Sequence, residues 1–292
     1  MGHREIFLSL SNGETGLWIR YLVSGGDQAK GSFMLAVFEN ENVSGIRYGD
    51  EDFIVGQEGE SHVGDSFVDL RNNRSFGSKI PHDIRWTNLE DRITAISGMT
   101  RLFDFRSRYI LVSPYSSFDG NISFKGKVYD LNDYRGMVGY ISQPDYLKEW
   151  SWMHVSGSEE DESMWMDLLV SNRKIGNGKV SLFSGRIDGK HIRSFIPAKF
   201  VGGNGFQGIR GELRASGEGF TIDSYAPGEN TVKVKYDRVK RNEVFCYNTE
   251  IAHSTIYWKG RKYTPLSSFQ EYGTSISVGK FPEVGTEDER KE

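Results

Sequence analysis

The feature that most constrains the fold is a repeated pattern of short apolar runs separated by Gly, Asn and Asp, with scarcely any helical periodicity. Alternating apolar and polar residues are typical of strands, and the intervening residues favour tight turns. The 34 glycines and the aromatic share of 13% agree with a chain of many strands and turns. We therefore predict an all-β protein, a sandwich or barrel, and not a parallel α/β sheet. The predicted strands and hairpins span residues 16–23, 31–39, 92–105, 121–131, 179–189, 220–225, 231–239 and 254–263.

Three short segments predict where hairpins turn. Asp188-Gly189 and Lys259-Gly260 are dipeptides of the kind that two-residue hairpin turns use. The acidic run SEEDES (158–163) lacks the spacing of a calcium-binding loop. We interpret it as the solvated loop of a hairpin that joins residues 150–157 to residues 164–171.

The domain organisation follows from one segment near the middle of the chain. The 292 residues suffice for one large β domain or for two ordinary ones. Residues 136–149, GMVGYISQPDYLKE, combine Gly, Pro and charge. We predict an N-terminal β domain over 1–140, a C-terminal β domain over 141–284 and a charged tail over 285–292. One continuous large sandwich remains the alternative.

Composition argues against several classes of partner. The net charge of −4 gives no strong attraction to nucleic acid or to an anionic membrane. There is no run of 18 apolar residues, so we expect no transmembrane segment, and the N-terminal sequence lacks the apolar core of a signal peptide. The single cysteine, Cys246, rules out an internal disulfide framework. Together these features predict a cytoplasmic protein.

No motif in the sequence predicts a cofactor or a metal. Residues 203–208, GNGFQG, match the spacing of a dinucleotide fingerprint, but a strand-like sequence follows where that motif needs a helix. The six histidines show no H-x-H or H-E-x-x-H spacing. No G-x-S-x-G elbow is present, so the sequence lacks the nucleophile motif of a serine hydrolase of the α/β type.

The most informative stretch is WSWMHVSG (150–157). As a strand it places Trp150, Trp152 and His154 on one face and Met153 and Val155 on the other. An ordinary core would use aliphatic residues, whereas indole and imidazole are apolar bodies with a polar edge. Two interpretations remain open: the aromatic face lines a ligand cavity, or it is a core or domain-interface strand.

Three segments resemble the two-domain lipocalin-like superfamily of the carotenoid 1,2-hydratases (hydroxyneurosporene synthases), the AttH-like proteins and the yeast survival-factor proteins. They are residues 16–41, residues 136–157 and SSFQEYGTSI (267–276). The resemblance implies two tandem lipocalin-like or calycin-like antiparallel β-barrels or half-barrels, with a hydrophobic pocket in or between them. This sequence also differs from the hydratases in one of these segments. Their Gly-Tyr step precedes an Asp-His-Asn-Trp-Gly run, whereas Gly139-Tyr140 precedes Ile-Ser-Gln, which contains no strong acid.

Three functional hypotheses follow. The first is binding of a small hydrophobic ligand, such as an isoprenoid, lipid or polyketide. The second is an enzyme of the hydratase, cyclase or isomerase type that acts on such a ligand by acid–base or shape catalysis. The third is a carbohydrate-active β-sandwich, which would need a pair of carboxylates on one wall. The candidate ligand-binding residues are Trp18, Tyr140, Trp150, Trp152 and Tyr272, and the candidate acid–base residues are His154 and Glu271.

Overall fold

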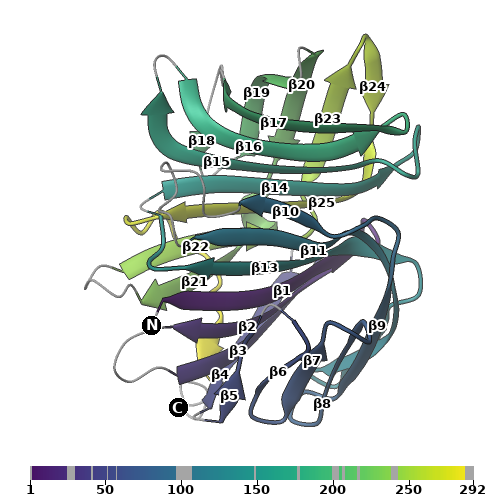
Figure 1. The fold of residues 1–292 in the computed structure, drawn as a ribbon. Coiled ribbons are helices and arrows are strands. Elements are labelled where there is room, and N and C mark those ends of the chain that lie inside the picture. The colour runs from purple at the N-terminus through teal and green to yellow at the C-terminus, as the bar shows by residue number, and fades with distance from the viewer. Residues whose placement is uncertain are drawn as a thin grey trace.

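The computed structural model consists of three β-sheets stacked in layers (Figure 1). The first sheet forms the lower part of the view in Figure 1, the second lies above it and the third lies at the top. All neighbouring strands run antiparallel except β26, which pairs with β4 in parallel. The structure describes residues 2–24, 30–40, 42–50, 52–56, 58–96, 107–147, 149–175, 178–198, 204–205, 208–215, 218–237 and 243–286.

The first sheet takes its strands from the N-terminal half of the chain and from one short C-terminal strand. Its order is β26-β4-β3-β2-β1-β13-β11-β9-β8-β7-β6-β5, and β10 and β12 also pair with β11. The strands are β1 (His3–Ser11), β2 (Thr15–Ser24), β3 (Lys30–Glu39), β4 (Asn42–Asp50), β5 (Phe53–Ile54), β6 (Glu60–Val63), β7 (Ser66–Asp69), β8 (Arg74–Gly77), β9 (His82–Asn88), β10 (Ile93–Ile96), β11 (Arg108–Phe124), β12 (Lys127–Asp130), β13 (Tyr134–Gln143) and β26 (Gly285–Thr286).

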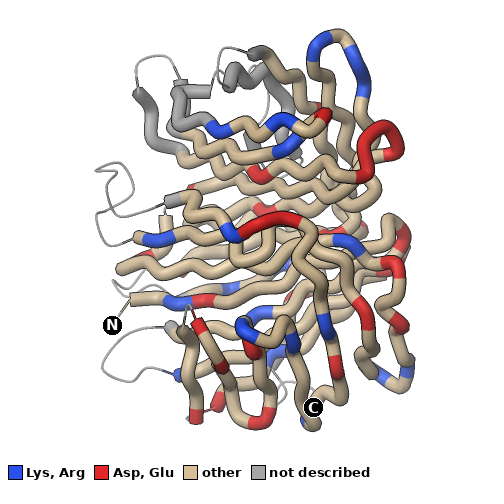
Figure 2. The backbone as a smooth tube through the Cα atoms, turned by 45° about the vertical axis from the view of Figure 1, so that its right-hand side comes forward, with Lys and Arg blue, Asp and Glu red and all other residues tan. Residues whose placement is uncertain are grey.

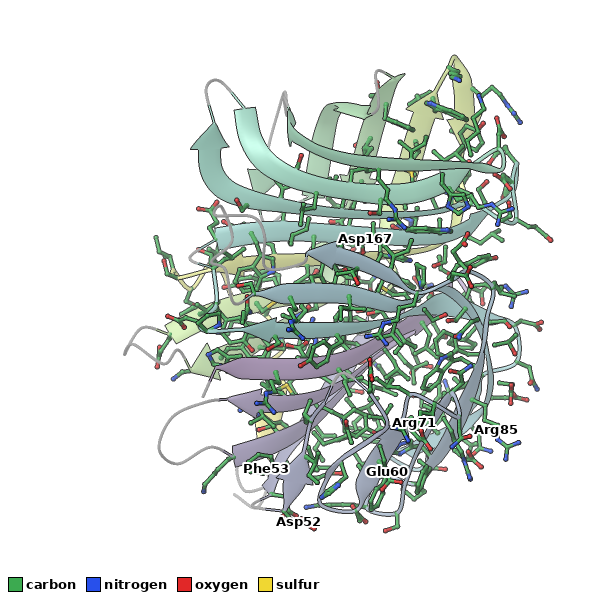
Figure 3. All side chains as sticks on the ribbon, in the orientation of Figure 1. Asp52, Phe53, Glu60, Arg71, Arg85 and Asp167 are labelled. Carbon is green, nitrogen blue, oxygen red and sulfur yellow. The ribbon has the colours of Figure 1, made fainter. Side chains whose placement is uncertain are left out.

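This sheet curls into a nearly closed barrel around its own core. Phe53 of β5 lies against β3, where a Cβ added to Gly31 would come within 2.5 Å of the Phe53 Cβ (Figure 3). Glycine is needed at position 31 because any side chain there would displace Phe53. The barrel interior is filled by one side of the alternating strands. Its buried residues include Ile6, Leu8, Tyr21, Phe33, Val68, Ile84, Trp86, Val138 and Tyr140.

The second sheet lies in the middle of the stack, in the order β17-β16-β15-β14-β25-β22-β21. Side chains on both of its faces are covered, one by the first sheet and the other by the third. The strands are β14 (Glu149–Ser158), β15 (Trp165–Ile175), β16 (Gly178–Ile187), β17 (Lys190–Ala198), β21 (Val232–Asp237), β22 (Glu243–Thr249) and β25 (Pro265–Thr274).

The third sheet covers the second, in the order β18-β19-β20-β23-β24. The core between these two sheets contains Met153 and Val155 of β14 together with Phe220, Ile222 and Trp258. The strands are β18 (Asn204–Gly205), β19 (Gly208–Ala215), β20 (Glu218–Tyr225), β23 (His253–Trp258) and β24 (Arg261–Tyr263), and a 3-10 turn spans Gly228–Asn230.

The all-β prediction is confirmed. No α-helix occurs among the residues that the structure describes. Both predicted hairpin turns form, with positive φ angles of 49° and 71° at Asp188-Gly189 and of 50° and 77° at Lys259-Gly260. The turn after β14 joins it antiparallel to β15, as the SEEDES interpretation requires. Of the predicted 92–105 strand, β10 covers Ile93–Ile96, and residues 97–106 lie outside the described residues, as do residues 203, 206 and 207 of the GNGFQG motif.

The strand order changes sheet between β13 and β14. β13 pairs with β1 through Gln143, so Ile141 still belongs to the first sheet. The division into domains over 1–140 and 141–284 stays a prediction. The predicted charged tail (285–292) begins with a short strand, since Gly285 and Thr286 pair with Ile46 and Arg47 of β4.

In Figure 2 the Lys and Arg residues (blue) and the Asp and Glu residues (red) are scattered over the described part of the tube. No helix in the described part of the chain is long and apolar enough to cross a membrane.

The two covered faces of β14 generate the first prediction. Met153 is 1% exposed within the core between the second and third sheets. Met153→Ala should lower the free energy of unfolding by about 2–5 kcal/mol, because it leaves a cavity in a packed core. Urea denaturation followed by circular dichroism measures the change. Val128→Ala, at a side chain that is 64% exposed, is the matched control, and equal losses for the two variants would contradict this packing.

Candidate functional site

The candidate site lies in the layer between the first and second sheets. β14 presents Trp150, Trp152 and His154 to this layer, and the alternation predicted for residues 150–157 is observed. Across the layer stand Phe7 of β1 and Trp18 of β2. The Phe7 ring meets the Trp152 ring edge to face, with the centroids 5.9 Å apart. Two sheets that are far apart in sequence therefore contribute aromatic rings to a single layer.

At one end of the layer, Asp167 of β15 gathers three hydrogen-bond donors on one carboxyl oxygen (Figure 3). Asp167 Oδ2 accepts from the Tyr109 hydroxyl at 2.9 Å and from the Trp152 indole at 2.9 Å. His154 Nδ1 lies 3.1 Å from the same oxygen. Burial and the nearby Asp167 raise the pKa of Tyr109 well above its usual value, so this hydroxyl stays protonated and donates. These residues, with Ser156, form what we term the His154 cluster.

The acceptor at Asp167 also sets the tautomer of His154. In the neutral ring, Nδ1 carries the proton toward Asp167, which leaves Nε2 to accept from the Ser156 hydroxyl 3.1 Å away. The ring is fully buried and lies nearly parallel to its aromatic neighbours, at interplanar angles of 22° to Trp152 and 11° to Phe269. An oriented neutral imidazole, whose Nε2 lone pair only accepts a hydrogen bond from a hydroxyl, is the form in which histidine accepts a proton.

At the other end of the layer, Arg20 of β2 is buried among carboxyl groups of both sheets. Its guanidinium pairs with Glu5 at 2.7 Å and, through a short contact, with Glu271 of β25. It also donates to the Tyr236 hydroxyl at 2.8 Å. Glu271 in turn accepts from the Trp150 indole at 2.6 Å. Arg20, Glu5, Glu271, Tyr236 and Trp150, together with the nearby Trp18, Asn248 and Glu250, form what we term the Arg20 cluster.

Burial shifts the acid–base properties of this cluster. Removal from water raises the pKa of Glu5 to about 7, with Arg20 opposing the shift and Glu271 adding to it. Burial likewise raises the pKa of Glu250 well above its usual value, against the effects of Arg20 and the Ser9 hydroxyl. Burial acts to lower the pKa of Arg20, but Glu271 and Glu5 raise it well above its usual value, so the guanidinium stays charged. One fixed cation therefore stands beside two carboxyl groups, those of Glu5 and Glu250, whose pKa values are raised by burial.

Two glycines make room for the aromatic layer. A Cβ added to Gly273 of β25 would lie 2.3 Å from the Trp150 ring, and one added to Gly139 of β13 would lie 2.3 Å from the Phe7 ring. Each ring thus lies flat across the strand beside it, at a position where only glycine fits. This explains the glycine in each of the two segments Gly139-Tyr140 and Glu271-Tyr272-Gly273.

The structure brings together five of the seven residues predicted from the sequence: Trp18, Trp150, Trp152, His154 and Glu271. Tyr140 instead belongs to the core inside the first barrel. Tyr272 lies on the reverse face of β25, where its ring stacks on Tyr247 and its hydroxyl donates to Glu149 at 3.4 Å. Each of these tyrosines is a chain neighbour of a layer residue, and alternation along a strand turns it away.

Sequence reasoning missed several residues that give the layer its ionisable groups: Glu5, Arg20, Tyr109, Asp167 and Glu250. A signal existed for two of them. Arg20 lies between Trp18 and Leu22 on one face of its strand, and Asp167 interrupts the apolar run MWMDLLV. A charged residue inside an apolar face marks a buried pair. No group of three or more His, Cys, Asp or Glu side chains in the described ranges is arranged to hold a metal ion.

Comparison with known proteins shows the fold. No family model matches the sequence, and no curated protein matches it. An AttH protein from Nitrosomonas europaea superposes with a TM-score of 0.59 at 10% identity, over 94% of this chain and 92% of the other. Kievitone hydratase from Nectria haematococca superposes with a TM-score of 0.55 at 9% identity, over 94% and 89% of the two chains.

These two structures confirm the resemblance predicted from the sequence, at the level of the fold. This chain has the lipocalin-like architecture of AttH and kievitone hydratase over nearly its whole length. At about one residue in ten identical, the likeness concerns the arrangement of strands and leaves the site to be argued from its own residues.

The raised pKa of Glu5 generates the second prediction. A carboxyl whose pKa rises from 4.5 in the unfolded chain to about 7 in the fold stabilises the fold fully below pH 4.5. That contribution is lost as the pH rises through about 7. Glu5→Gln keeps the neutral form at every pH, so it should match the wild type in acid and exceed its stability above neutrality by up to about 3 kcal/mol.

Urea denaturation at a series of pH values measures this effect as the difference between the two curves. Glu39→Gln serves as the control, because Glu39 lies outside the Arg20 cluster and pairs with Lys127 at the surface. A constant difference between wild type and Glu5→Gln across the whole range would show that Glu5 does not change its protonation on folding.

Proposed function

We propose that this protein binds a hydrophobic small molecule in the layer between its first and second sheets. The observation that carries the proposal is the composition of this layer, where indole, phenyl and imidazole rings with oriented polar edges lie among the aliphatic side chains. A layer that only joined two sheets would gain nothing from such groups, because every buried polar atom must then find a partner.

The rings favour particular classes of ligand. Trp150, Trp152 and His154 contribute aromatic rings from one sheet, and Phe7 contributes its ring from the other. Flat, conjugated or polycyclic molecules gain most from such surfaces, because ring stacking adds to the burial of apolar area. Isoprenoids, polyketides and unsaturated lipids fit this description. The shared fold with kievitone hydratase, which is named for acting on kievitone, supports a small-molecule ligand.

Trp152→Ala tests this proposal. The change removes ring contacts with the ligand, and we expect at least a tenfold loss of affinity, or about 1.4 kcal/mol. Quenching of tryptophan fluorescence by an apolar naphthylamine probe measures binding in the wild type, and displacement of the probe measures binding of other ligands. Native mass spectrometry of protein from its own host would identify the natural ligand.

Met153→Ala is the matched control, because Met153 is the chain neighbour that faces the third sheet. It should lose stability and keep its affinity for the probe. Should Trp152→Ala cost about 3–5 kcal/mol of stability, as truncation of a packed aromatic does, with unchanged affinity in the folded fraction, the layer would be a core and the proposal would be wrong.

The His154 cluster supports a second candidate function, acid–base catalysis on the bound molecule. Hydration of a double bond adds hydroxide to one carbon and a proton to the other, so an imidazole that takes a proton from water can, as the imidazolium, give that proton to the second carbon. His154 Nε2 is held ready to accept a proton, and Asp167 stabilises the imidazolium that results. Glu271 is less suited to this role, since Arg20 and Trp150 already occupy its oxygens.

Incubation of the co-purified ligand in water enriched in heavy oxygen tests this second candidate. Wild-type protein should incorporate the label, and His154→Gln and Asp167→Asn should each reduce the rate by about two to four orders of magnitude. Tyr272→Phe, on the reverse face of β25, should keep the wild-type rate. Labelling that survives both His154→Gln and Asp167→Asn would remove the His154 cluster from the chemistry.

The carbohydrate-active hypothesis finds less support in the described residues. Glu5 and Glu271 do form a close pair of carboxyls, but Glu5 is buried, the Glu271 side chain is only 10% exposed, and both hold the same guanidinium. A glycoside-cleaving pair instead flanks the bond on two sides of an open substrate.

A further inference from the structure

Four buried polar atoms of the Arg20 cluster have neither a hydrogen-bond partner nor an ion-pair partner among the described residues. Their residues come from both sheets and are at most 4% exposed. Each such atom costs about 1–3 kcal/mol if it stays unpaired, so a group with oxygen or nitrogen atoms is expected to meet them. The four atoms are Trp18 Nε1, Arg20 Nε, Asn248 Nδ2 and Glu250 Oε2.

These atoms lie around one guanidinium. Arg20 Cζ sits 4.3 Å from the centroid of the Trp18 ring, and Arg20 Nη2 is 3.5 Å from Asn248 Oδ1. Glu250 packs against the same face of β2, where a Cβ added to Gly16 would lie 2.5 Å from the Glu250 Cβ. Gly16, Trp18 and Arg20 alternate along β2 and share that face. The unpaired atoms therefore belong to one place in the layer.

The kinds of atom determine what this place can hold. Trp18, Arg20 and Asn248 present N–H donors, and Glu250 presents an oxygen. A group bound here must accept hydrogen bonds from these N–H donors and must form one more hydrogen bond with the Glu250 oxygen. A hydroxyl does both, and a carbonyl accepts from the N–H groups and from a protonated Glu250.

The charge of the cluster excludes an anion. Arg20 is already paired with Glu5 and Glu271, and Glu250 lies close enough for its pKa to respond to both Arg20 and Glu271. A carboxylate or phosphate would add a negative charge to a buried site whose single guanidinium is already paired with Glu5 and Glu271, and burial strengthens the repulsion between like charges. A neutral oxygen group meets no such penalty.

We infer that the Arg20 cluster binds a neutral oxygen group, a hydroxyl or a carbonyl, at one end of a hydrophobic ligand. This inference rests on the proposed binding function and specifies the ligand further. The Phe7 ring lies between the two ends of the layer, 5.5 Å from Arg20 Cζ and 5.9 Å from the Trp152 ring. An apolar body held by its oxygen at Arg20 would extend across Phe7 toward Trp152 and His154.

Three probes of equal chain length test the inference: dodecanol, dodecanoate and dodecane. Their affinities are measured by displacement of the naphthylamine probe at about pH 8, where dodecanoate is fully ionised. Wild-type protein should bind dodecanol about tenfold more tightly than either of the others, a difference of about 1.4 kcal/mol.

Two variants on opposite sheets should abolish this preference for dodecanol over dodecane. Trp18→Phe keeps the ring and removes its N–H, and Asn248→Leu keeps the volume and removes the amide. Because they lie on different sheets, a folding defect in one leaves the other as an independent test. Tyr272→Phe, which removes a hydroxyl outside the cluster, should keep the wild-type preference.

The outcomes separate this inference from the function on which it rests. Equal binding of dodecanol and dodecane by the wild type would mean that the unpaired atoms hold only water, which overturns the inference and leaves the proposed function intact. Tightest binding of dodecanoate would overturn it as well, because Arg20 would then act as a free cation. Failure of all three probes and of the naphthylamine to bind would overturn the proposed function itself.

Discussion

The interaction on which the rest of the structure depends is the burial of Arg20 between two sheets. Its guanidinium is contributed by β2 of the first sheet and is held by Glu5 of the same sheet and Glu271 of the second. A buried charge without partners costs several kcal/mol, so separation of the sheets at this point would leave three charged groups to be solvated anew. The cluster therefore sets how the sheets face one another, and with that it sets which aromatic rings meet in the layer.

The second sheet is unusual in serving two cores. On β14, Met153 and Val155 pack against the third sheet, while Trp152 and His154 face the first. A strand covered on both sides normally carries aliphatic residues on both. In β14 the face of Met153 and Val155 follows that rule, and the face of Trp152 and His154 does not. A polar-edged aromatic face, in a layer that also contains acid–base groups with ordered partners, is typical of a functional site, where residues serve function at some cost in stability.

Much of this architecture could be predicted because strand formation is local. Alternation in residues 16–23 and 150–157 predicted two strands and the residues that share a face of each, and Gly189 and Gly260 predicted the turns. The Arg20 and His154 clusters were only half predicted. Trp152 and His154 could be identified from residue type alone. An arginine or aspartate in a strand could not, because its residue type does not reveal whether water or another sheet covers it.

The sequence by itself determined the all-β class, the strand positions and the aromatic face of 150–157, because a period of two residues is written into neighbouring side chains. Only the tertiary structure decided what covers each face. It placed Glu5 and Glu271, more than 260 residues apart, on one guanidinium. It also turned Tyr140 and Tyr272 away from the layer that their neighbours enter. Pairing between distant strands sets these contacts, since a residue's burial depends on the partner sheet and not on the residue alone.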